Sequence, residues 1–211
     1  MTEANHAERR LELVSTVLLA LATVATAWSA YQARQWTGVQ SQSYSKATTN
    51  RIAENRYSAL ANRQVQIDVA TFIQWVDARE HHDTALADFY RERFRAEFQP
   101  AFAAWLARRP FADARAPKTP FAMPQYHLQD SARADSLELI AAGFSDRAGV
   151  ANQRANNYTL AVVLFASSLF FAGISTKLRT IRARTAILVL GCLLFLGTAI
   201  WLATLPARVS L

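Results

Sequence analysis

Three long apolar segments dominate the hydrophobic pattern of this chain, and polar or amphipathic stretches fill the residues between them. The segments are residues 11–31, 158–176 and 185–205, followed by a short tail, 206–211. A helix needs about 20 residues to cross a hydrocarbon core of about 30 Å, and each segment has about that length. The pattern therefore predicts an all-α integral membrane protein with three transmembrane helices and an extramembrane helical bundle or hairpin.

Basic residues at the ends of these segments predict the orientation. They are Arg9, Arg10, Lys177, Arg179, Arg182 and Arg184. Because short cytoplasmic segments retain Lys and Arg, we expect residues 1–10 and the connector 177–184 in the cytoplasm and residues 32–157 outside it. Tyr158 and Trp201 are expected at the outer ends of their spans, where amphipathic rings suit the headgroup layer.

The first apolar segment has two interpretations. Residues 25–27, Ala-Thr-Ala, have the form of a signal-peptide cleavage site, so one interpretation is a cleaved signal peptide. The other is a retained span. Two glutamates before the segment and an uninterrupted helical pattern beyond residue 27 favour the retained span.

This segment also separates small and bulky residues onto opposite faces of a helix, at about 100° per residue. With Glu12 near its inner end, the small face carries Thr16, Ala20, Thr23, Thr26, Ala27 and Ala30. Helices in lipid associate through close packing, so another helix is expected on this face. That helix belongs either to the other two spans or to further copies of the chain, whose hydroxyl groups would line a narrow polar pore. At the edge of the span, Glu12 is expected to reach the interface.

The segment 32–157 predicts a helical domain without strands. Residues 32–51 are polar and are expected to continue the first helix outward, and apolar residues at helical spacing return in residues 52–79. The polar break at residues 80–83 suits a hairpin tip. Aromatic residues at helical intervals follow, and Pro100 is expected to start a new helix segment. One long ascending helix with two shorter descending helices fits these lengths. A broken first helix folded into a squat bundle is the alternative.

Residues 109–127 hold four of the six prolines and therefore predict an extended crossing loop instead of a helix. Four apolar side chains predict that this loop packs against the helices: Phe111, Phe121, Met123 and Tyr126. A helix is expected to restart near Asp130 or Ser131, either of which can cap it, and to run into the second span.

Three stretches carry a resemblance to a known family. They are residues 89–106, residues 120–126 with the sequence Pro-Phe-Ala-Met-Pro-Gln-Tyr, and residues 151–158 before the second span. Together they resemble a widespread family of small bacterial membrane proteins with one span, a soluble helical segment and two further spans. The resemblance covers nearly the whole chain and implies a bacterial inner-membrane location, but it implies no activity.

Composition and charge limit the kinds of binding site that are expected. Although the net charge is +7, residues 32–157 contain 16 basic and 13 acidic residues, so the basicity reflects topology more than nucleic-acid binding. Cys192, the single cysteine, lies within the third span, which excludes an intrachain disulfide. His81, His82 and His127 match no zinc-binding spacing, even with their acidic neighbours. No cofactor, metal or nucleic-acid partner is therefore expected.

The sequence contains no Gly-rich phosphate loop and no nucleophile elbow, so no catalytic residue is expected. We expect a non-enzymatic inner-membrane protein whose outer helical domain binds a partner protein or senses a ligand. The alternative is a homo-oligomeric channel or transport component lined by the small face of the first span. The expected partners are the lipid bilayer, a partner protein and, in the alternative, further copies of the chain.

Overall fold

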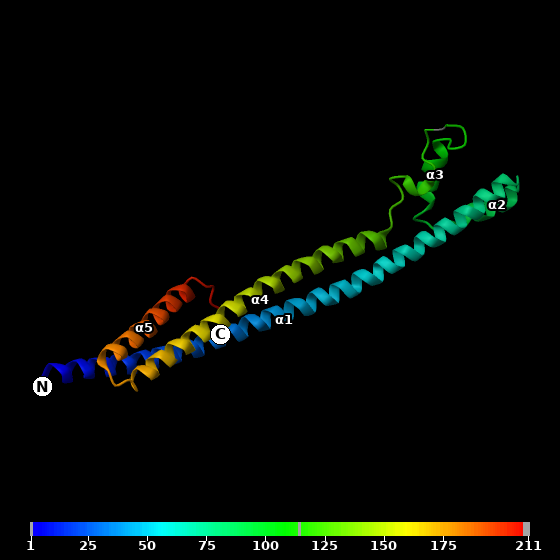
Figure 1. Ribbon diagram of the computed structural model, residues 1–211. Helices are drawn as coiled ribbons and strands as arrows, with labels where there is room; N and C mark the ends of the chain where they lie inside the picture. The colour runs from blue at the N-terminus through cyan, green and yellow to red at the C-terminus, as the bar shows by residue number, and fades with distance from the viewer. Residues whose placement is uncertain (1, 114, 209–211) are drawn as a thin grey trace. The chain divides into compact units, whose positions relative to one another are not determined.

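The computed structural model describes residues 2–113 and 115–208, with side chains from residue 8 onward (Figure 1). Its elements are α1 (Thr2–Glu80), α2 (Thr84–Glu92), α3 (Gln99–Ala107), the short 3-10 helix η1 (Pro120–Ala122), α4 (Gln129–Ser175) and α5 (Ile181–Ala203). The described part contains no strand, and α1, α4 and α5 are each long and apolar enough to cross a membrane. The predicted all-α class with three candidate spans is confirmed.

The first helix is continuous. Figure 1 shows α1 as one unbroken ribbon from Thr2 to Glu80. The polar stretch after its apolar segment contains no proline, and its one glycine, Gly38, has open space around it, so nothing there forces a kink. The alternative of a broken first helix is therefore excluded.

Two helix starts, those of α3 and α4, agree with the prediction, and the start of α5 differs from it. α4 begins one residue before Asp130, which lies in its first turn, where an acid suits the helix dipole. α5 begins at Ile181 and includes Arg182 and Arg184, which the sequence had assigned to the connector. α3 begins with Pro100 in its first turn, as predicted, because proline lacks only an N–H that would be unpaired there.

The chain forms two compact units, which we call the membrane unit and the aromatic unit. The membrane unit comprises the described residues up to Ser45 and from Phe144 onward, and the aromatic unit is Lys46–Gly143. Both boundaries fall inside residues 32–157, which the sequence had treated as one outer domain. The difference arises because α1 and α4 still pack together, around Trp36, beyond their apolar segments.

In the membrane unit, the buried faces of the long helices follow steps of three and four residues. On α1 the buried positions include Ser15, Leu18, Ala22, Ser29, Gln32 and Trp36, and on α4 they include Ala151, Ala155, Tyr158, Ala161, Phe165, Ser168, Ala172 and Ser175. This spacing is typical of left-handed helix packing. Most of the α4 positions are small, which lets the backbones approach closely, as helix association in lipid requires.

Hydroxyl groups and one glycine join these helices. The Ser168 hydroxyl on α4 donates to the carbonyl oxygen of Gly191 on α5 at 2.9 Å, and the hydroxyls of Ser15 and Ser175 lie 3.3 Å apart. A Cβ at Gly191 would lie 3.2 Å from the Cβ of Phe171 and 3.4 Å from the Ser168 carbonyl oxygen. The close approach of α4 and α5 therefore depends on the missing side chain at Gly191.

At the other end of the membrane unit, a buried amide ties the segment after α5 to α1. The Gln32 side chain donates to the carbonyl oxygen of Arg208 at 3.0 Å and accepts from its backbone N–H at 2.9 Å. In the neighbouring cluster, Tyr158 is 1% exposed and packs with Trp36. The Tyr158 ring, which the sequence predicts at the outer end of its span, therefore packs between helices.

Replacing Gly191 by leucine is expected to destabilise the membrane unit, because the new side chain would meet Phe171 and the Ser168 carbonyl. We expect the Tm of full-length Gly191→Leu protein in detergent, followed by circular dichroism, to fall by about 4 °C or more. Gly197→Leu is the matched control, since nothing lies within 4 Å of a Cβ at Gly197 on the same helix. Equal Tm values for the two variants would contradict the close approach.

Rings from several elements form the core of the aromatic unit. Its buried members are Phe72, Trp75, Phe94, Phe98, Ala101, Phe102, Trp105 and Met123. Phe72 meets Trp105 edge to face at a centroid distance of 5.4 Å, and Trp75 meets Phe102 at 4.8 Å, geometries that the ring quadrupole favours. Phe121 and Tyr126 pack against this core, which confirms that the proline-rich segment packs on the helices.

A buried carboxylate lies beside this core. Asp68 on α1 is fully buried, and its Oδ2 accepts from Nη1 of Arg95 at 2.8 Å and from Oη of Tyr126 at 3.1 Å. Arg95 also pairs with Glu97, whose Oε1 accepts from the backbone N–H of Gln129 at 3.3 Å. This network joins α1, the link between α2 and α3, the proline-rich segment and the start of α4.

Burial raises the pKa of Asp68 above its ordinary value, while the charge of Arg95 and the Tyr126 hydrogen bond oppose that shift. A raised pKa in the folded state means that folding favours the protonated acid. The contribution of Asp68 to stability is therefore largest at low pH and is lost as the pH rises through the raised pKa.

The Asp68→Asn variant tests this pH dependence, because asparagine keeps an acceptor for Arg95 and Tyr126 but cannot titrate. We expect the free energy of unfolding of the wild type, relative to Asp68→Asn, to increase as the pH falls from about 7 to about 4. The slope is at most about 1.4 kcal/mol per pH unit. Denaturant unfolding followed by near-ultraviolet circular dichroism provides the measurement. A difference that shrinks on acidification would instead mean that Arg95 keeps the carboxylate ionised.

Candidate ligand-binding cleft

The turn between α1 and α2 sets the end of one helix beside the start of the next. His82 has a φ of 58°, a left-handed conformation that helps to reverse the chain. Asp83 then caps α2, since its Oδ1 accepts from the backbone N–H of Leu86 at 2.9 Å. The predicted hairpin tip at residues 80–83 is confirmed.

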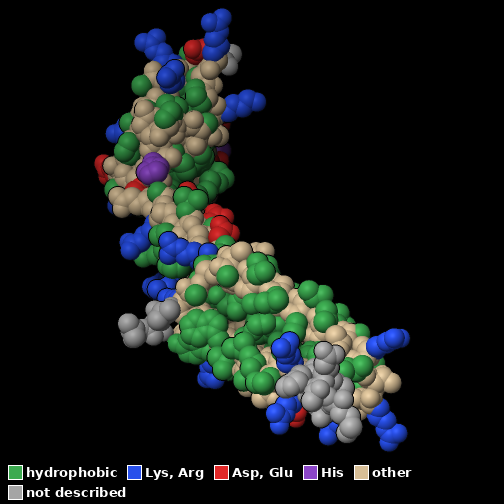
Figure 2. Space-filling view, turned by 90° about the vertical axis from the view of Figure 1, so that its left-hand side faces the viewer, with side chains coloured by type: hydrophobic (Ala, Val, Ile, Leu, Met, Phe, Trp, Pro, Cys, Tyr) green, Lys and Arg blue, Asp and Glu red, His purple; other side chains and the backbone are tan. Residues whose placement is uncertain are grey.

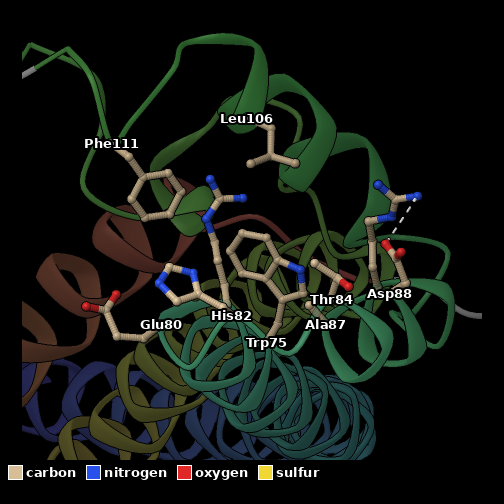
Figure 3. A pocket seen from close by; sticks show the side chains of 10 residues that line it. Trp75, Glu80, His82, Thr84, Ala87, Asp88, Leu106 and Phe111 are labelled. Atoms are coloured by element: carbon tan, nitrogen blue, oxygen red, sulfur yellow. Dashed lines mark ion pairs between the residues drawn. The ribbon is translucent and has the colours of Figure 1, made fainter.

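A cleft of about 600 Å³ lies beside this turn (Figure 3). The end of α1, the turn, α2, α3 and the loop after α3 supply its lining, which consists of Trp75, Arg79, Glu80, His82, Thr84, Ala87, Asp88, Arg91, Leu106 and Phe111. Figure 3 shows Trp75, Leu106 and Phe111 around the cleft, with Glu80 at its edge. All of these residues belong to the aromatic unit.

The floor of the cleft is part of the aromatic core. Trp75 is 4% exposed and contacts the rings of Phe72, Phe102 and Trp105. Phe111 is 58% exposed, and its ring centroid lies 6.4 Å from that of Trp75 and 5.6 Å from that of Trp105. The cleft therefore has a floor fixed by packing and a wall that presents an exposed ring.

Arg79 occupies the space between floor and wall. Its guanidinium carbon lies 4.4 Å from the ring centroid of Phe111 and 5.6 Å from that of Trp75, which is cation–π contact with both. The ion pairs found among the described residues do not include Arg79. The two rings therefore hold this positive charge, and no described carboxylate neutralises it through an ion pair.

Besides Arg79, the charged side chains in the lining are Arg91, Asp88 and Glu80. Nη2 of Arg91 lies 3.8 Å from Oδ1 of Asp88, which is one turn earlier on α2, and both side chains are more than half exposed. Such exposed pairs contribute little stability, because water screens them. Arg79 and Glu80 are then the charged groups of the cleft that lie outside the ion pairs found among the described residues, and of these two Arg79 is the one held against the rings.

This arrangement suits an anion with an apolar body. A guanidinium held against rings still presents N–H donors along its edge, which match the two oxygens of a carboxylate or a phosphate. The surfaces of Trp75, Leu106 and Phe111 provide apolar contact area beside that edge.

The small face predicted on the first span lies elsewhere and is not covered within the single chain. Among its members Thr16, Ala20, Thr23, Ala27 and Ala30 are exposed, as is Glu12, and Thr26 is half-buried. The neighbouring stripe makes the contacts between helices, through Ser15, Ala22 and Ser29. Thr16 and Thr23 donate to carbonyl groups four residues earlier in their own helix. The two stripes differ by one residue, or about 100° of rotation.

The remaining candidates from the sequence do not assemble into a site in the described part of the chain. The basic residues that were predicted to set the topology are exposed at Arg9, Arg10, Lys177, Arg179 and Arg182 and half-buried at Arg184. Where side chains are described, no group of three His, Cys, Asp or Glu residues is arranged to hold a metal ion.

No pattern in the sequence predicted the cleft. Trp75 and Arg79 are four residues apart on α1, a spacing that places a ring beside a cation and could have drawn attention to this helix end. Phe111 lies in the proline-rich loop, and no local pattern connects it with α1. Its contact with Arg79 arises only when α3 has packed against α1.

A comparison of the chain with protein-family models, with curated proteins and with solved structures gives no match.

Proposed function

We propose that this chain is a non-enzymatic protein of the bacterial inner membrane whose aromatic unit binds a small amphipathic anion in the cleft. In this proposal residues 1–10 and the connector before α5 are cytoplasmic, and the cleft lies outside the cytoplasm. The three apolar helices and their basic flanks support the membrane assignment. The observation that carries the ligand assignment is the Arg79 guanidinium, stacked on two rings without a described acidic partner.

The chemistry of the lining favours binding over catalysis. Thr84 offers a hydroxyl and His82 an imidazole, but no hydrogen bond between their side chains is found in the described structure. A hydroxyl nucleophile needs such a base to become reactive. The fixed floor at Trp75 instead favours recognition of a planar or aliphatic body. Because packing already holds this side chain in place, binding costs little conformational entropy there.

Binding of aromatic carboxylates to the full-length protein in lipid nanodiscs tests the proposal. The probes are benzoate, indole-3-acetate and naphthalene-2-carboxylate, with naphthalene-2-carboxamide as the uncharged match of the last. We expect at least one carboxylate to bind by isothermal titration calorimetry and the carboxamide to bind more weakly. In Arg79→Ala the affinity for the carboxylate should fall about tenfold or more, because a charge-assisted hydrogen bond is lost.

Arg63→Ala is the matched control, since Arg63 is an exposed arginine of the same helix and does not line the cleft. It should leave the affinity unchanged. Arg79 is itself exposed, so its replacement is expected to leave the fold intact. Failure of all three carboxylates to bind, or equal affinities for Arg79→Ala and Arg63→Ala, would refute the proposed ligand site.

A second candidate function is a homo-oligomeric channel or transport component. The observation in its favour is the exposure of the small face of α1, because an uncovered face of this kind suits close packing against another helix. Copies of α1 gathered around this face would turn the hydroxyls of Thr16 and Thr23 toward a common axis.

Cysteine accessibility separates this candidate from the first. Cys192 is replaced by alanine, and single cysteines are introduced as Thr16→Cys, Thr23→Cys and, as a lipid-facing control, Val24→Cys, whose native side chain is 68% exposed. A channel predicts modification of the first two by a charged thiol reagent and protection of the third. Equal protection at all three positions contradicts a water-filled pore lined by this face.

A further inference from the structure

A cluster of one tryptophan and two arginines lies just beyond the ends of the three apolar segments in the membrane unit. Trp36 is five residues after the first segment, Arg154 is four residues before the second, and Arg208 is three residues after the third. Trp36 shares one contact cluster with residues of α4 and with residues at the end of α5, which are Ala151, Ala155, Tyr158, Leu202 and Leu205. These contacts place the ends of the three segments at one level.

Two features mark this level as the border of the apolar surface. At the end of the first segment, Trp28 and Tyr31 are each 43% exposed, and their ring centroids lie 5.9 Å apart. Exposed Trp and Tyr are enriched where a helix passes from hydrocarbon to headgroups. Figure 2 shows hydrophobic side chains gathered on one face of the molecule, with Lys and Arg side chains at the border. Trp36, about 7.5 Å further along α1 than Tyr31, therefore lies at headgroup depth when the helices span a bilayer.

Both guanidinium groups of the cluster lie against Trp36. The guanidinium carbon of Arg154 is 4.4 Å from the ring centroid of Trp36, and that of Arg208 is 6.0 Å from it. The backbone of Arg208 is fixed by its two hydrogen bonds with the side chain of Gln32, one turn before Trp36 on α1. The fold therefore brings two positive charges to one ring.

The cluster contains donors but no described acceptor. The ion pairs and side-chain hydrogen bonds found among the described residues include neither the Arg154 nor the Arg208 guanidinium. The indole Nε1 of Trp36 is also without a hydrogen-bond partner in the described structure. Contact with a ring attracts each guanidinium but does not neutralise it, so the two like charges repel each other.

Carboxylates are scarce at this end of the membrane unit. The described residues 32–45, 144–157 and 204–208 contain one acid, Asp146. It is eight residues before Arg154, which is about 12 Å along α4. The counter-charge for the two arginines must therefore come from outside the described part of the chain.

We infer that Arg154 and Arg208 bind the headgroup phosphate of an anionic phospholipid. Phosphate oxygens are strong acceptors for guanidinium groups, and their negative charge offsets the repulsion between the two arginines. The depth of the cluster selects a lipid as the source of the phosphate, because headgroups surround the end of a span.

A zwitterionic headgroup fits this cluster less well than an anionic one. Its ammonium group would need an acid or a free ring face. The cluster has no described acid, and the guanidinium groups of Arg154 and Arg208 already contact the Trp36 ring. The ligand is therefore a lipid with net negative charge, such as phosphatidylglycerol.

Native mass spectrometry of the full-length protein tests the inference. Detergent-solubilised protein is titrated with phosphatidylglycerol, with phosphatidylcholine of the same acyl chains, or with inorganic phosphate. We expect phosphatidylglycerol to have the lowest dissociation constant of the three. Arg154→Gln and Arg208→Gln should each raise that constant about fivefold, because each removes one charge from the phosphate site.

Arg34→Gln is the matched control. Arg34 is exposed at the same end of the membrane unit, and it is two residues from Trp36, or about 200° around α1. The variant removes the same charge and should leave the affinity for phosphatidylglycerol unchanged. An effect equal to that of Arg154→Gln would overturn the inference, because it would indicate a diffuse basic collar.

The remaining arms separate lipid binding from other causes. Arg154→Lys keeps the charge and should retain most of the affinity. A loss equal to that of Arg154→Gln would contradict the phosphate site, because it would reflect lost packing on Trp36. Equal dissociation constants for the two lipids would also contradict it. Inorganic phosphate that binds as tightly as phosphatidylglycerol would exclude a lipid as the ligand.

Discussion

The aromatic unit depends on the burial of one carboxylate. Asp68 on α1 is fully buried, and a carboxylate removed from water needs strong donors. Arg95 and Tyr126 provide them from two separate segments, and Arg95 is held in turn by Glu97. The link between α2 and α3 and the proline-rich segment must therefore both reach α1. The rings around Phe72 can then close into one core.

Different interactions stabilise the two units. In the membrane unit, lipid surrounds the helices, so burying apolar surface against another helix yields little, and the contacts instead use close approach. Gly191, Ser168 and the row of alanines on α4 serve that purpose. In the aromatic unit, water surrounds short helices, and large rings such as Phe98 and Trp105 supply the buried area. The same long helices, α1 and α4, take part in both.

The cleft lies where the aromatic core ends. Trp75 belongs to that core, yet the turn at His82 stops α1 one turn later and leaves an edge of the core uncovered. Arg79 and Phe111 lie over this edge without closing it. A ligand in this position would meet surfaces already fixed by packing, which keeps the entropic cost of binding low.

Local properties of the sequence determined the class of this protein. Hydropathy over about 20 residues marks the spans, the run of prolines excludes a helix at residues 109–127, and Pro100 marks a helix start, since each depends only on neighbouring residues. The tertiary structure alone decided which side of α1 is covered. Thr16 and Ser15 offer equally small surfaces one residue apart, and the positions of α4 and α5 select Ser15. It also decided the cleft, because Arg79 and Phe111 are distant in sequence and meet only through the packing of α3 on α1.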